Sequence, residues 1–125
     1  MSAITSLDDI AAWENVWKIL ADEGASPVLV FKASPRCGVS RSAEARFQNF
    51  AETLDDDANV RLYRVDVVNA RPVSQRIAKD TGVTHASPQA LLIRAGQKVT
   101  WDASHFAITE DSLRECLETD PGAWK

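Results

Sequence analysis

Cysteine and histidine are scarce in this sequence. Its 125 residues include two cysteines, Cys37 and Cys116, and two histidines, His85 and His105. Two cysteines are too few for the disulfide framework of a small secreted protein, and four such residues make a poor ligand set for zinc. We therefore expect free thiols in a reducing compartment, the cytoplasm, with no metal and no bound cofactor.

Long apolar runs are also missing. No stretch reaches the roughly 18 to 20 apolar residues of a membrane-spanning helix, and Met1 to Asp9 lacks the basic-then-apolar order of a secretory signal. The net charge of -4 comes from interspersed acids and bases, which gives no electrostatic footprint for nucleic acid or an anionic membrane. We expect neither partner. The sequence does not indicate an oligomeric state, and a monomer is our expectation.

Hydrophobic residues are plentiful by contrast. They make up 45% of the chain, enough for 125 residues to bury a core without disulfides or metal. We therefore expect one domain over residues 1–125.

Apolar spacing predicts alternating helices and strands. Predicted are a helix over 7–22 opened by a Ser6–Asp9 capping box, a buried parallel strand over 27–33, a helix from Cys37 to Leu54, a strand over 60–67, a helix capped by Asn69 and ending at Thr81-Gly82, strands over 89–95 and 98–102, and a helix from Thr109 to Asp120-Pro-Gly122. The last two strands are too close for a crossover helix and must pair antiparallel. An α/β fold follows, with three α/β/α layers and a mixed sheet of about four strands. Ala3 to Thr5 could add a short edge strand.

The sequence Cys37-Gly-Val-Ser40 follows the predicted buried strand and opens a helix. This places the sulfur at the carboxyl end of the sheet, where α/β folds bind their ligands. Unpaired N–H groups and the positive end of the helix dipole favour a thiolate there, and Lys32, Arg36 and Arg41 add positive charge nearby. The alternative is a cysteine that only fills space at the turn.

A second motif, Ser87-Pro88, lies between the third helix and the predicted hairpin. The trans isomer is the commoner one for a bond to proline. A cis proline opposite the cysteine would leave backbone groups of Ser87 free to pair with an extended thiol substrate.

Further residues join these motifs into a recognisable set. They are Val30-Phe-Lys-Ala-Ser34 with Cys37 and Ser40, Ser87-Pro88-Gln89, and Trp101 with Ser104-His105 and Ile108-Thr109. Together they resemble the thioredoxin fold and, more narrowly, the monothiol bacilliredoxins, small bacterial oxidoreductases associated with the low-molecular-weight thiol bacillithiol. The resemblance spans roughly Trp13 to Leu117.

The resemblance implies a thioredoxin-like fold, with Cys37 as the catalytic cysteine and Pro88 as the cis-proline. We place Ser40 with Cys37 among the catalytic residues and Arg36, Gly38, Val39, Ser87 and Pro88 at substrate-binding positions. Bacillithiol or another low-molecular-weight thiol is the implied co-substrate, and S-thiolated proteins are the implied partners. One departure is Gly38, because the family commonly has proline there. Glycine is more flexible, which bears on rate and redox poise more than on the nucleophile.

A mechanism follows from the number of sulfurs. Ser40 stands where dithiol oxidoreductases have a resolving cysteine, so Cys37 can attack a mixed disulfide but cannot finish by closing a ring. We expect Cys37 to become S-thiolated until a second thiol regenerates it, with Ser40 as a hydrogen-bond donor to the thiolate. Two alternatives stay open: the same chemistry with glutathione, and a thioredoxin-like binding module without turnover.

The other conspicuous residues are interpreted as mainly structural. Cys116 shares a helical face with Leu113 and Leu117 and is expected in the core. His105 fits either function or a brace for the last helix, and His85 is at most a rim residue. The tryptophans at positions 13, 17 and 101 are expected to pack. The arginines at positions 36, 41, 71 and 76 are expected on a solvated face, although some could form a positive rim for carboxylate-bearing thiols.

Overall fold

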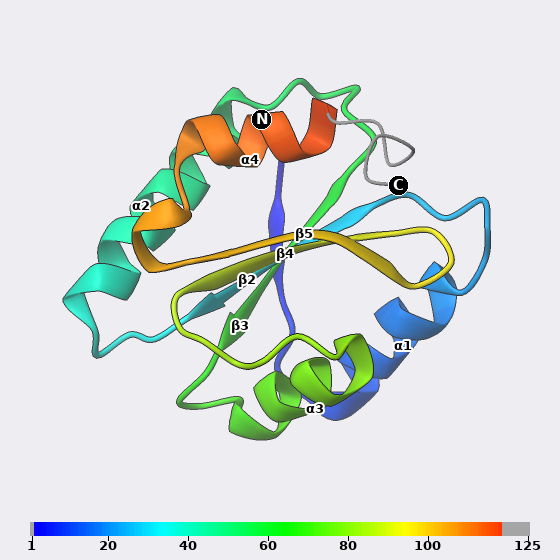
Figure 1. Ribbon diagram of the computed structural model, residues 1–125, viewed down its shortest axis with the longest axis horizontal. Helices are drawn as coiled ribbons and strands as arrows, with labels where there is room; N and C mark the ends of the chain where they lie inside the picture. Colours follow the sequence, from blue (N-terminus) through cyan, green and yellow to red (C-terminus); the bar gives the residue numbers. More distant parts are fainter. Residues whose placement is uncertain (1, 119–125) are drawn as a thin grey trace.

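A five-stranded mixed sheet forms the middle layer of the computed structural model, which describes residues 2–118 (Figure 1). The elements are β1 (Ile4–Ser6), α1 (Ile10–Leu20), β2 (Val28–Ala33), α2 (Gly38–Thr53), β3 (Arg61–Asp66), α3 (Arg71–Thr81), β4 (Gln89–Arg94), β5 (Lys98–Ser104), the 3-10 turn η1 (His105–Ala107) and α4 (Glu110–Glu118). The strand order is β1-β3-β2-β4-β5. Within the described part of the chain, no helix has the length and apolarity needed to cross a membrane.

Helices cover both faces of the sheet, α2 and α4 on one side and α1 and α3 on the other (Figure 1). Side chains of the central strand β2 alternate between the two cores: Leu29 and Phe31 pack under α2 and α4, whereas Val28 and Val30 pack under α1 and α3. Every residue of β2 is buried. The predicted three-layer sandwich and its buried central strand are therefore confirmed.

The sheet has five strands where the sequence predicts about four, and the fifth lies close to the possible edge strand at Ala3 to Thr5. Ile4–Ser6 pairs parallel with β3, with Ile4 opposite Leu62, and the Ile4 side chain packs on the core under α2 and α4. Pairing rather than local sequence makes these three residues a strand, since so short a segment carries little intrinsic preference.

Two predicted helix caps are wrong. Asp9, not Ser6, caps α1: its carboxylate accepts from the Ala12 N–H at 2.8 Å. Ala70 occupies the cap position of α3, and the Asn69 amide instead donates to Asp66 at 2.8 Å. In both cases the chain just before the helix makes other hydrogen bonds. Before α1, the Leu7 N–H donates to the Arg64 carbonyl at 2.9 Å, and before α3 the Asn69 side chain is held by Asp66.

The start of α4 is confirmed. The Ser112 N–H donates to the Thr109 hydroxyl at 3.0 Å, and the Thr109 N–H donates to the Ser112 hydroxyl at 2.9 Å, so the two residues cap the helix reciprocally. The predicted end of this helix at Asp120-Pro-Gly122 lies outside the described residues.

Candidate redox site

Three connecting segments meet at one edge of the sheet. The parallel strands β2 and β3 both end there, and β4, antiparallel to β2, begins there, with Gln89 opposite Lys32. The N–H of Val67, just after β3, donates to the Ala33 carbonyl at 2.9 Å. The segment that carries Cys37, the segment after β3 and the loop before Pro88 are therefore neighbours (Figure 1).

Cys37 occupies the N-cap position of α2, as predicted. Its backbone is extended (φ -110°, ψ 126°), and its carbonyl accepts the first helical hydrogen bond, from Arg41 N–H at 3.0 Å. The side chain makes no capping hydrogen bond, and the residue is free and half-buried. The half-buried Cys37 therefore lies at the amino end of a 16-residue helix, where the unpaired N–H groups of the first turn point.

Ser40 lies in the first turn of α2 and is fully buried. Its hydroxyl oxygen accepts a hydrogen bond from the Ser34 N–H at 2.7 Å. This contact joins the helix to the end of the connection from β2, and so fixes the loop in which Cys37 sits. No hydrogen bond joins Ser40 to Cys37 within residues 2–118, and the role of Ser40 at the sulfur stays a prediction.

The residues around Cys37 that are predicted to bind substrate are accessible. Arg36 and Gly38 are exposed and Val39 is half-buried. A methyl group added at Gly38 would meet nothing within 4 Å, so the space above the helix start is open. The structure thus places these residues beside the sulfur, while their binding role stays a prediction.

The peptide bond between Ser87 and Pro88 is cis, the isomer that the resemblance implies. Pro88 is buried, and its carbonyl accepts from the His105 N–H at 3.0 Å. Within the described residues neither backbone polar group of Ser87 has a partner, and its buried hydroxyl has none either. Ser87 therefore has hydrogen-bonding groups to spare at the edge where Cys37 lies.

A buried basic residue lies at the same edge, on the face covered by α3. Lys32 is fully buried, donates from Nζ to the Ser74 carbonyl at 3.1 Å, and lies 3.3 Å from Nδ1 of His85. Burial lowers the pKa of Lys32 from 10.5 to about 8. Burial also lowers the pKa of His85, and the positive charges of Lys32 and Arg71 lower it further. The sequence signal for this cluster was a single charged residue in an otherwise apolar strand.

The structure keeps Cys116 apart from this site. It is 5% exposed in the core under α4, and its thiol donates to the Leu113 carbonyl at 3.1 Å. Burial raises the pKa of Cys116 to about 12, so the thiol stays protonated in the folded protein. The core assignment from sequence is confirmed.

The aromatic predictions also hold within the described residues. Trp13 is fully buried, Trp17 stacks on it at 5.6 Å between ring centroids, and Trp101 packs against the opposite core. Trp124 lies outside the described residues. His105 is exposed and lies in η1, where its backbone N–H donates to the Pro88 carbonyl at 3.0 Å, and neither of its two predicted roles is tested by this contact.

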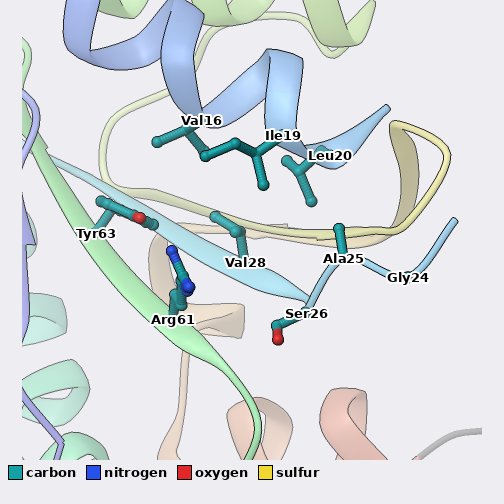
Figure 2. A pocket seen from close by; sticks show the side chains of 9 residues that line it. All are labelled: Val16, Ile19, Leu20, Gly24, Ala25, Ser26, Val28, Arg61 and Tyr63. Atoms are coloured by element: carbon teal, nitrogen blue, oxygen red, sulfur yellow. The ribbon is translucent and has the colours of Figure 1, made fainter. Parts of the chain in front are cut away.

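A separate small hollow of about 180 Å³ lies at the other end of the sheet (Figure 2). Figure 2 shows it between the last turn of α1, with Ile19 and Leu20, and the beginnings of β2 and β3, at Val28 and Arg61. Because Cys37 follows the opposite end of β2, this hollow takes no part in its chemistry.

The family model for monothiol bacilliredoxin BrxC matches residues 8–113. This chain belongs to the monothiol bacilliredoxin family. The match covers most of the chain and includes both Cys37 and Ser87-Pro88, and so supports a thiol–disulfide redox role for this bacilliredoxin.

Solved structures agree on the fold. A structure described as a candidate oxidoreductase with a thioredoxin fold matches with a TM-score of 0.73 and 29% identity, over 90% of this chain and 92% of that one. Thioredoxin of Malassezia sympodialis matches with a TM-score of 0.69 and 14% identity, over 94% and 90% of the two chains. Thioredoxin of Fasciola hepatica matches with a TM-score of 0.67 and 21% identity, over 91% and 96%. The bacilliredoxin therefore has the thioredoxin fold.

Proposed function

We propose that this bacilliredoxin removes bacillithiol, or a similar low-molecular-weight thiol, from S-thiolated proteins in the reducing cytoplasm. The observation that supports this most is the contrast between its two sulfurs. Cys37 is half-buried and uncapped at the start of α2, whereas Cys116 is sealed in the core with its thiol bonded to Leu113. One accessible sulfur suits single-cysteine exchange.

The exchange step balances in atoms and electrons. The Cys37 thiolate attacks the small-thiol sulfur of a protein–S–S–R disulfide; that S–S bond breaks, and the target protein leaves as a thiolate that takes up a proton. Cys37 becomes the mixed disulfide Cys37–S–S–R, and so carries the oxidation that the target has lost. A second small thiol then attacks this disulfide, releases R–S–S–R, and restores the Cys37 thiol.

Ser87 provides a further reason to expect a disulfide substrate. Its N–H and carbonyl are unpaired within residues 2–118, and it adjoins β4 at the edge where Cys37 lies. An extended peptide beside the sulfur could exchange backbone hydrogen bonds with these groups.

Intact-mass spectrometry tests this proposal. The reduced protein is mixed with a peptide that carries bacillithiol on its cysteine, and in a parallel arm with a glutathionylated peptide. We expect one small-thiol adduct on Cys37, release of the free peptide, and loss of the adduct with excess thiol. Cys37→Ser should abolish the transfer, whereas Cys116→Ser, the matched control, should keep it.

Each other outcome has a defined meaning. No adduct in either arm would favour a binding module without turnover, and an adduct that persists in Cys37→Ser would move the chemistry to Cys116. Reaction with the glutathionylated peptide alone would keep the exchange chemistry and replace bacillithiol by glutathione.

A further inference from the structure

A hollow of about 420 Å³ opens beside the redox site, on the face covered by α3. Its lining residues are Val67, Val68, Arg71, Ser74, Gln75 and His85. Two of its walls belong to the segments that form the redox site: Val67 is bonded to Ala33 at the end of β2, and His85 lies two residues before Ser87. The hollow and Cys37 therefore share the carboxyl edge of the sheet.

The lining of this hollow is basic, and none of the described residues in it is acidic. Arg71 is exposed, and its side chain has no ion pair or hydrogen bond within residues 2–118. The groups whose charge acts on His85 are Lys32 from β2 and Arg71 from α3, and both are positive. The nearby carboxylate of Asp66 is engaged by the N–H groups of Val68 and Asn69, each at 2.9 Å.

Within residues 2–118, no carboxylate lines the hollow, and the charged groups that act on His85 are both positive. Lys32, buried behind the wall, donates to the Ser74 carbonyl, and the Ser74 hydroxyl lies 3.1 Å from Nδ1 of His85. The positive charges of Lys32 and Arg71 both act on His85, and a bound anion would offset them. The first turn of α3, which supplies Arg71 and Ser74, adds the positive end of a helix dipole.

We propose that this hollow binds a carboxylate of the low-molecular-weight thiol while the sulfur of that thiol reacts at Cys37. The planar guanidinium of Arg71 pairs with the carboxylate, and Ser74 and His85 supply further donors. The inference rests on the proposed function, since it concerns the small-thiol substrate of the same site. It makes Arg71 a specificity-determining residue that favours acidic over neutral thiols.

Two disulfides of different charge test the subsite. Stopped-flow measurement gives the rate constant for thiolation of Cys37 by oxidised glutathione, which carries carboxylates, and by bis(2-hydroxyethyl) disulfide, which is neutral. Loss of one charged hydrogen bond corresponds to about a tenfold effect, so Arg71→Gln should slow the glutathione reaction about tenfold. The neutral disulfide should react within about twofold of its original rate, since the lost partner was a carboxylate.

Lys79→Gln is the matched control. Lys79 lies on the same helix as Arg71, is exposed, and is not among the residues that line the hollow. Its replacement by glutamine removes one positive charge, as Arg71→Gln does. Neither rate should change in Lys79→Gln. Equal effects of Arg71→Gln on both disulfides, or none on either, would overturn the subsite and leave the exchange activity standing.

A binding measurement separates this inference from the proposed function. We expect L-malate, titrated into the intact protein and followed by NMR, to shift the amide signals of residues 71–75 and to raise the pKa of His85. Arg71→Gln should lose both responses. If neither disulfide reacts with Cys37, the proposed function fails, while the malate titration still decides whether the hollow binds a carboxylate. Unchanged spectra at saturating malate would overturn the subsite.

Discussion

The two cysteines lie in regions that differ in how fully their polar groups are hydrogen-bonded. The Cys116 thiol donates a hydrogen bond to the Leu113 carbonyl, and apolar side chains of α2, α4 and the sheet enclose it. Around the carboxyl end of β2, by contrast, the described residues give the Cys37 side chain no capping hydrogen bond, the polar groups of Ser87 no partner, and the buried Lys32 no carboxylate. The candidate redox site is thus the region where the side chains make fewer stabilising contacts.

The largest expected effect is a difference in alkylation rate between the two thiols. With the pKa of Cys116 at about 12, against the usual 9.0, its thiolate population near pH 8 is about a thousandfold lower than that of an ordinary thiol. We therefore expect brief iodoacetamide treatment to label Cys37 and to spare Cys116. Peptide mass mapping before and after unfolding measures this. If the folded protein alkylates Cys116 at a rate within tenfold of the rate at Cys37, the predicted difference between the two thiols is wrong.

The next effect concerns Lys32. Because burial lowers its pKa to about 8, the folded state carries an unfavourable charge at pH 7, and Lys32→Met should raise the unfolding free energy by about 2 kcal/mol. Between pH 8 and 10.5 the unfolded chain holds this proton more tightly than the folded one, so the parent protein gains stability with rising pH. The advantage of the methionine variant should therefore shrink across this range.

Urea unfolding of both proteins at pH 7 and pH 10 measures this difference. Lys79→Met serves as the exposed control and should change stability little at either pH, since Lys79 lies on the surface of α3. A destabilised Lys32→Met at pH 7 would mean that the bond to Ser74 outweighs the burial of the charge.

A smaller effect separates the same substitution at the two sites. Cys116→Ala removes a buried sulfur and its hydrogen bond to Leu113 and should lower the unfolding free energy by about 1 to 2 kcal/mol. Cys37→Ala removes a half-exposed, unbonded side chain and should change it by less than about 0.5 kcal/mol. Thermal unfolding followed by circular dichroism compares them. Equal losses at the two positions would show that Cys37 also serves the core.

The sequence predicts the elements whose character is local. A few neighbouring residues are enough to predict β2 from its apolar run, α2 from its apolar spacing and the hairpin from its short connection. The sequence therefore places Cys37 correctly at the start of α2. It does not establish β1 beyond a possible edge strand over Ala3 to Thr5, because Ile4–Ser6 becomes a strand only by pairing with β3. Nor does it separate Asp9 from Ser6 as a cap, because that choice depends on where Leu7 is tied down.

The site divides in the same way. The motif around Cys37 is contiguous, so its place could be inferred from the sequence. The partners of Lys32 lie 42 and 53 residues away in Ser74 and His85, and only the crossing of α3 over the sheet brings them together. A lysine in an otherwise apolar strand indicates a buried charge, but the sequence does not identify Ser74 and His85 as its hydrogen-bonding partners.

The smallest expected effect tests whether the redox end has spare stability. Gly38 is the first residue of α2, its N–H makes no hydrogen bond within residues 2–118, and an added Cβ meets nothing within 4 Å. Proline suits this first helical position, and it requires an extended residue before it, which Cys37 with φ -110° and ψ 126° already is. Gly38→Pro should therefore raise the unfolding free energy by about 0.5 to 1 kcal/mol, chiefly by restricting the unfolded chain.

Urea unfolding of Gly38→Pro beside Gly38→Ala isolates the backbone contribution, since alanine fills the same open space without fixing φ. We expect the proline variant to be the more stable of the two and to keep Cys37 open to alkylation. If proline destabilises the protein, the start of α2 tolerates substitution less well than its geometry indicates. The contrast with the surroundings of Cys116 would then rest on the unpaired groups of Ser87 and on the buried charge of Lys32.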